Sequence, residues 1–147
     1  MAHPSEAVEH DIAVRCGLVL REHIAAGQRT PWLARLQTAF VLTRSGAAET
    51  EFGAESGLPR LVRGAGSVVC YPARLRRRSR ALPPEGLHYT AALVSFELFP
   101  GVDLLDFVDL PMLLPPERGA RIGETLEDLA NLAGDCPGPF LRAARRQ

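Results

Sequence analysis

Five arginines fall within the seven residues from Arg74 to Arg80, in the stretch GSVVCYPARLRRRSR (66–80). A guanidinium group offers five N–H donors in a planar fork, which suits a carboxylate, a phosphate or sugar hydroxyls. The run therefore has three interpretations. It is a solvated strand face with one arginine paired to an acid, the wall of a small-molecule pocket, or a direct DNA contact. No aromatic or helical reading element accompanies the run, which argues against DNA contact.

Alternation along a strand divides this run into two faces. Arg74, Arg76, Arg78 and Arg80 share one face, and Leu75, Arg77 and Ser79 share the other. A barrel strand turns one face inward, so at least one arginine points to the interior. The sequence leaves open whether that is Arg77 alone or the even-numbered set.

The other groups capable of chemistry are scattered. The four histidines are His3, His10, His23 and His88, and no two form a His-x-His pair. A transition-metal site needs about three convergent ligands, so we predict no metal and no cofactor. The segment GAGSV is not a nucleophile elbow, and the chain has no lysine for a phosphate-binding loop. We therefore predict no catalytic residues and a protein that is not an enzyme.

The amino-acid composition is that of an ordinary globular domain. The chain has 147 residues, of which 46% are hydrophobic and 23% charged, with a formal net charge of zero. This neutrality argues against a dedicated nucleic-acid-binding domain, which is usually basic. The first twenty residues carry acids where a signal peptide needs a basic start, and no apolar run reaches the length of a membrane span. We predict a cytoplasmic protein without a membrane partner.

Most of the chain reads as short strands divided by glycine and proline turns. This pattern is typical of a sandwich or a small barrel. The expected strands cover 10–24, 34–43, 48–52, 58–62, 67–71, 74–80 and 87–99. One amphipathic helix is expected at 117–134, because Ile122, Leu126, Leu129 and Ala133 recur at helical spacing and Leu132 widens this stripe. The stripe either covers the domain's own core or pairs with a second chain.

Together these motifs resemble the N-terminal regulatory half of AraC-family transcription regulators over about residues 30–134. Gly66 matches the family's strand-leading glycine, residues 68–71 the strand, and Pro72 the proline. Val94-Ser95-Phe96 (94–96) matches a valine-histidine-phenylalanine triplet, with serine in place of histidine. The resemblance implies a mainly β fold: a cupin-like double-stranded β-helix, or jelly-roll barrel, with a C-terminal amphipathic helix. It places the regulatory domain at 1–134 and leaves 135–147 as a linker or the start of a DNA-binding half that this chain lacks.

The function implied is small-molecule sensing by a non-enzymatic, metal-free domain that also dimerises. The effector would be a sugar or a carboxylate, and DNA and the transcription machinery would be reached only through the missing half. The pocket residues expected are Arg35, Tyr71, Arg76 and His88, with Trp32 at the mouth; a register shift of one would exchange Arg76 for Arg77. A homodimer is expected through Ile122, Leu126, Leu129 and Ala133.

Two alternatives stay open at this stage. One is a stand-alone small cupin enzyme, such as an isomerase, an epimerase or an oxygenase. The other is a dimerisation module whose barrel has collapsed and holds no ligand. Fold by itself does not decide among them.

Overall fold

The computed structural model describes residues 13–135. His3, His10 and the predicted linker from residue 136 onward lie outside this range. The described elements are β1 (Ala13–Ile24), β2 (Thr38–Phe52), η1 (Ala54–Ser56), β3 (Leu61–Gly64), β4 (Val68–Tyr71), β5 (Arg77–Ala81), β6 (Leu87–Phe99), β7 (Val102–Asp103), η2 (Leu104–Asp106), β8 (Leu113–Leu114) and α2 (Pro116–Asp135).

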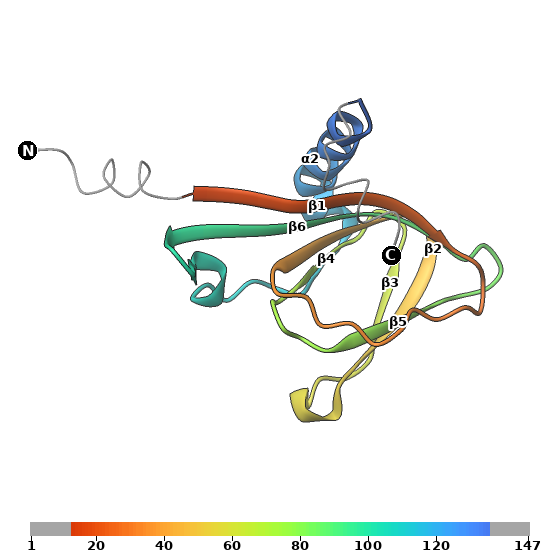
Figure 1. Ribbon diagram of the computed structural model, residues 1–147. Coiled ribbons are helices and arrows are strands. Elements are labelled where there is room, and N and C mark those ends of the chain that lie inside the picture. The colour runs from red at the N-terminus through yellow and green to blue at the C-terminus, as the bar shows by residue number, and fades with distance from the viewer. Residues whose placement is uncertain (1–12, 136–147) are drawn as a thin grey trace, which may run out of the picture.

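Strand β2 belongs to two sheets at once. Its first half pairs with β4 and β6 in a larger antiparallel sheet of order β1-β6-β2-β4-β8, and β7 lies beside β6. Its second half pairs with β3 on one side and β5 on the other, forming a smaller sheet. The two sheets curve around a common interior, as Figure 1 shows, while α2 lies outside.

Gly46 is the point at which β2 passes from one sheet to the other. It has φ +78°, and a Cβ on it would lie 1.9 Å from the carbonyl oxygen of Gly86. Only glycine tolerates both this conformation and this approach. We expected a turn near here that ends one strand and begins another. The structure instead bends a single strand, because both halves keep their ladder partners.

The larger sheet is buried on both faces only in its centre, because the edge strand β1 is mostly exposed. Its inner face contributes Ala39, Val41, Val69 and Tyr71 to a core inside the barrel. Its outer face is covered by α2, whose Leu126 packs with Val68 and Ala92. All four residues of β4 are buried as a result, and burial on both faces accounts for its continuous apolar sequence.

The helix can approach the sheet closely because of two glycines. A Cβ on Gly119 would meet Val68 at 3.1 Å, and one on Gly123 would meet Leu42 at 3.2 Å. These glycines weaken the helix in isolation, so packing against the sheet stabilises it. The predicted helix and the mainly β antiparallel architecture are confirmed. No helix within residues 13–135 is both long and apolar enough to cross a membrane.

The strand with the arginine run begins later than expected. We predicted a strand over 74–80, but β5 starts at Arg77. The N–H of Leu75 donates to the carbonyl of Pro72 in a turn, and Arg74 adopts the left-handed conformation with φ +66°. The buried positions of β5 are Arg77, Ser79 and Ala81, so the odd-numbered residues face the interior.

Candidate ligand-binding site in the barrel

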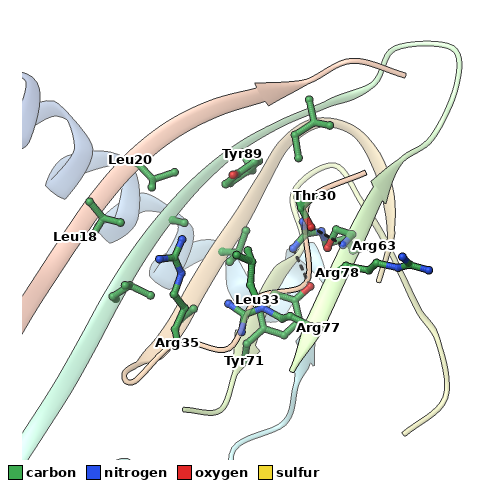
Figure 2. Close-up of a pocket in the computed structure, with 16 residues that line it drawn as sticks. Leu18, Leu20, Thr30, Leu33, Arg35, Arg63, Tyr71, Arg77, Arg78 and Tyr89 are labelled. Carbon is green, nitrogen blue, oxygen red and sulfur yellow. Dashed lines mark hydrogen bonds between the residues drawn. The ribbon is translucent and has the colours of Figure 1, made fainter. Parts of the chain in front are cut away.

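A cavity of about 80 Å³ lies in the interior between the two sheets. Figure 2 shows its lining side chains converging from strands of both sheets and from the segment that precedes β2. The larger apolar side chains of its wall are Leu18, Leu20, Ile24, Leu33, Val41 and Leu93. Arg35 lines the cavity and is also exposed to solvent.

Tyr71 connects the two sheets across the interior. Its side chain extends from β4, and its hydroxyl lies 2.9 Å from the Oγ1 of Thr50 on β2. Thr50 Oγ1 lies 2.7 Å from the Oγ of Ser79 on β5, and Nη1 of Arg63 donates to the Tyr71 hydroxyl at 3.1 Å. Because Tyr71 accepts from Arg63, its own proton is available to Thr50. The four side chains form one hydrogen-bonded polar cluster, of which Arg63, Tyr71 and Ser79 line the cavity.

Two arginines of the cavity are almost completely buried. Arg63 on β3 is 4% exposed and Arg77 on β5 is 7% exposed. The guanidinium carbon of Arg77 lies 4.2 Å from the centroid of the Tyr71 ring, and that of Arg63 lies 5.8 Å from it. Burial, together with the nearby cations of Arg35 and Arg63, lowers the pKa of Arg77 to about 10. The group is still charged at pH 7, without the solvation of water.

A second tyrosine stands near the end of the cavity. Tyr89 of β6 lines the wall, and its hydroxyl donates to Glu22 of β1 at 2.8 Å. Burial and this carboxylate raise the pKa of Tyr89. The tyrosine is therefore a neutral hydrogen-bond donor whose partner is already present.

The structure brings together two of the five residues expected in the pocket. Arg35 and Tyr71 line the cavity, whereas Arg76, His88 and Trp32 do not. Because the inward face of β5 is odd-numbered, Arg77 occupies the place expected for Arg76, as the alternative register anticipated.

The three residues outside the cavity lie on the exterior. Arg76 is exposed, and its guanidinium carbon lies 4.4 Å from the ring centroid of Trp32. Arg78 stands 4.7 Å from the same ring. His88 is exposed and stacks on His23, with ring centroids 4.1 Å apart. This pair occupies directly opposed positions on β1 and β6.

Arg63 is the residue that sequence reasoning missed. Within β3, Leu61 and Arg63 are less exposed than Val62, which lies between them. The alternation of the short segment LVRG was a usable signal, since it places Arg63 on the side of Leu61. Its hydrogen bond to Tyr71 depends on tertiary structure and had no local signature.

The expected dimer residues divide between two roles. Leu126 is 3% exposed and packs against the sheet of its own chain, with Ile122 beside it. Leu129 and Ala133 are half-buried, and Leu132 is exposed. Leu126 therefore covers its own core, so it does not present a surface to a second chain. The dimer itself stays a prediction.

Glu127 attaches the helix to three strands of the larger sheet. It accepts hydrogen bonds from Thr90 on β6 and from Arg21 on β1, the latter at 2.9 Å, and pairs with Arg44 on β2 at 3.3 Å. Burial raises the pKa of Glu127, but the Thr90 hydrogen bond and the two arginines outweigh it, and the net pKa is lowered. The carboxylate is thus held ionised.

Among residues 13–135, no group of three or more His, Cys, Asp and Glu side chains is placed to hold a metal ion. Arginines, hydroxyls and apolar groups are the functional groups of the cavity. This arrangement is suited to binding through charge and hydrogen bonds.

No protein-family model and no curated protein matches the chain. Solved structures similar to it include a variant of oxalate decarboxylase from Bacillus subtilis, with 17% identity over 51% of this chain and a TM-score of 0.45. An RmlC-like cupin family protein with a double-stranded β-helix fold from Methanocaldococcus jannaschii shares 9% identity over 51% of this chain and 66% of its own, with a TM-score of 0.46. A putative mannose-6-phosphate isomerase from Ralstonia eutropha shares 24% over 56% of this chain and 83% of its own, with a TM-score of 0.42.

The chain itself has a mainly β antiparallel fold with one C-terminal helix, and the double-stranded β-helix is the fold named for the Methanocaldococcus jannaschii protein. The match spans only 20% of the oxalate decarboxylase chain. The prediction that the protein is not an enzyme is wrong as an inference from this fold, because the similar structures include an oxalate decarboxylase and a putative isomerase. The link to AraC-type regulators is not among these findings.

Proposed function

We propose that this chain is the small-molecule-sensing and dimerisation domain of an AraC-type transcription regulator, with the effector bound in the barrel cavity. The observation that carries the proposal is the cavity itself, which joins an apolar wall to the polar cluster around Tyr71. Ligand pockets combine these two features, because apolar surface supplies affinity and a few polar groups supply orientation. The motifs from Gly66 to Phe96 that resemble the AraC family supply the regulatory role.

The position of α2 supports a sensing role for the same cavity. The strands that wall the cavity also carry α2 on their outer face, and Glu127 attaches it to them. A ligand that prefers one arrangement of these strands would shift the position or order of the helix. Differential binding to two arrangements is the physical requirement for such a sensor.

The dimer would form through the exposed side of α2. Leu132 is 66% exposed, and the half-buried Leu129 and Ala133 lie near it in the last turns. The substitution Leu132→Glu would place a charge in this contact, whereas Val62→Glu places one on an exposed position of β3. We expect the first variant to be monomeric and the second to behave as the wild type in analytical ultracentrifugation.

The test of sensing is a small-molecule screen by thermal shift, followed by hydrogen exchange of α2. We expect at least one compound to raise Tm in a saturable way and to change amide protection in residues 116–135. A compound that is converted to product would contradict the sensing role and favour the alternative of a small cupin enzyme. The absence of any stabilising compound would favour a dimerisation module.

A further inference from the structure

We propose that the occupant of the cavity is a small organic acid whose carboxylate binds between Arg63 and Arg77. The inference deepens the proposed function, on which it rests. It assigns the effector to one chemical class, an anionic head on an apolar body, and Arg63 and Arg77 to its recognition.

The two buried cations, Arg63 and Arg77, have no acidic partner within residues 13–135. No carboxylate lines the cavity, and neither arginine takes part in an ion pair within residues 13–135. Buried charges in proteins are normally paired, because removing them from water is costly. An anion that enters the cavity would supply the missing charge.

The arginines on the outer face of the same small sheet are paired, unlike the two buried in the cavity. There Arg60 and Arg80 pair with Glu49, and Arg78 pairs with Glu51, although all three arginines are far more exposed than Arg63. The chain thus pairs the arginines that water already solvates and leaves the buried ones unpaired. Structural stabilisation would call for the opposite distribution.

Most hydrogen-bond donors of the Arg63 and Arg77 guanidinium groups are available to a ligand. The Nε of Arg63 is buried and has no hydrogen-bond partner among residues 13–135. Arg77 donates one hydrogen bond, at 3.3 Å, to the carbonyl of Leu75. Each guanidinium has five N–H donors, so most of this capacity is available to a ligand. A carboxylate accepts two such bonds side by side in the plane of the guanidinium.

The aliphatic side chains of the cavity indicate what the rest of the ligand would be. The wall opposite the arginines is built from leucine, isoleucine and valine side chains of β1, β2 and β6, and the cavity measures about 80 Å³. Figure 2 shows Leu18 and Leu20, both on β1, on the side of the cavity across from Arg77 and Tyr71. This aliphatic part of the wall favours a compact apolar group over a polyhydroxylated one, because leucine, isoleucine and valine side chains offer a hydroxyl no hydrogen-bond partner.

The shape of the donor set favours a carboxylate over a phosphate. Phosphate sites usually add backbone N–H groups from a helix N-terminus or a glycine-rich loop. The cavity wall consists of strands and one connecting segment, and α2 lies outside the barrel. Two side-chain forks match the two oxygens of one carboxylate.

The experiment uses the full chain and a graded panel of carboxylates, namely acetate, butanoate, cyclohexanecarboxylate and benzoate. Each is paired with its neutral amide, and inorganic phosphate forms a separate arm. Binding is followed by amide shifts in two-dimensional NMR, which suits a 16.0 kDa protein, up to about 50 mM ligand. We expect at least one carboxylate to shift cavity residues such as Ala91, and its amide to bind at least about thirtyfold more weakly.

Three variants locate the effect. Arg63→Met and Arg77→Met remove one fork each and should each weaken carboxylate binding by at least about thirtyfold. Arg80→Met is the matched control, because it lies on β5 but on the outer face, and it should bind as the wild type. Amide spectra of each variant establish that it is folded.

The outcomes separate this inference from the proposed function. If amides or phosphate bind as well as the carboxylates, or if no carboxylate in the panel shifts cavity residues, the ligand class is wrong. A neutral compound from the screen that still protects α2 would then leave the sensing role standing. Carboxylate binding without any change at α2 would confirm the ligand class and overturn the sensing role.

Discussion

Replacing Arg77 by methionine tests whether this arginine serves the fold or its occupant. The pKa of Arg77 falls from 12.5 to about 10, and at about 1.36 kcal/mol per pKa unit the buried charge costs roughly 3 kcal/mol. The cation–π contact with Tyr71 at 4.2 Å returns about 2 kcal/mol. The long hydrogen bond to Leu75 adds at most about 1 kcal/mol. These contributions nearly cancel.

We therefore expect Arg77→Met to change the free energy of unfolding by less than about 1 kcal/mol, since methionine keeps the apolar stem. Breaking a true buried ion pair would instead cost about 3–5 kcal/mol. The measurement is urea unfolding followed by the fluorescence of Trp32, the one tryptophan of the chain. Arg80→Met on the same strand is the control and should stay within about 0.5 kcal/mol. A loss of 3 kcal/mol or more from Arg77→Met would refute the reasoning, because it would mean that the charge is already compensated in the ligand-free fold.

Three further predictions concern the scaffold. Leu126→Ala empties a buried position under α2 and should lower the free energy of unfolding by about 2–5 kcal/mol in urea titration; a smaller loss would mean that the helix is not docked through this side chain. Gly46→Ala should cost about 2 kcal/mol or more and lower Tm accordingly, because the added Cβ meets a carbonyl oxygen and φ is positive. Glu127→Gln should cost about 1 kcal/mol. Since the folded-state pKa of Glu127 is lowered, its contribution is present above the unfolded value of 4.5 and is lost as pH falls through the folded pKa. Wild-type and Glu127→Gln stabilities should therefore converge as the pH falls below 4.5 and through the lowered folded-state pKa, and a constant difference across pH would contradict this role.

The hydrophobic pattern of the sequence was sufficient to predict the bounds of β6 and α2. The long strand at 87–99 was predicted with the bounds that the structure gives it, and the helix at 117–134 was placed within one residue at each end. The helix buries one face along its length, so its apolar residues recur at a fixed spacing, whereas the middle of β6 packs on both faces of the sheet and reads as a nearly continuous apolar run. Helical spacing and an apolar run can both be read directly from a sequence.

The positions at which prediction failed depend on contacts between distant segments. Gly46 reads equally as the turn of a hairpin or the bend of one strand, and only the carbonyl of Gly86 decides between them. The start of β5 depends on Arg74, whose left-handed conformation has no sequence signature in an arginine. The face that β5 turns inward follows from its pairing with β2, in which Ser79 lies opposite Thr50 and Arg77 opposite Phe52.

The sequence predicted an arginine in the candidate site, but it did not predict all of the residues that line the cavity. An arginine from the run was expected in the pocket, and alternation left Arg77 as one of two choices. Arg63 could have been placed inward by the same rule. Its lack of an acidic partner is a property of the assembled barrel, because it depends on which strands carry glutamates and on which face.

Alternation along β6 also explains how one strand can serve both the cavity and the helix. Tyr89 and Ala91 face the cavity, while Thr90 between them points outward and donates to Glu127 on α2. A ligand that moves the inner residues must move the peptide units that carry Thr90, because neighbouring side chains share the same backbone. Glu127 also binds Arg21 and Arg44 from the two strands that flank β6, so the helix responds to the mutual positions of three strands. In the proposed sensor, β6 and Glu127 would therefore carry the coupling between the cavity and α2, for which allosteric systems typically need about 1–3 kcal/mol.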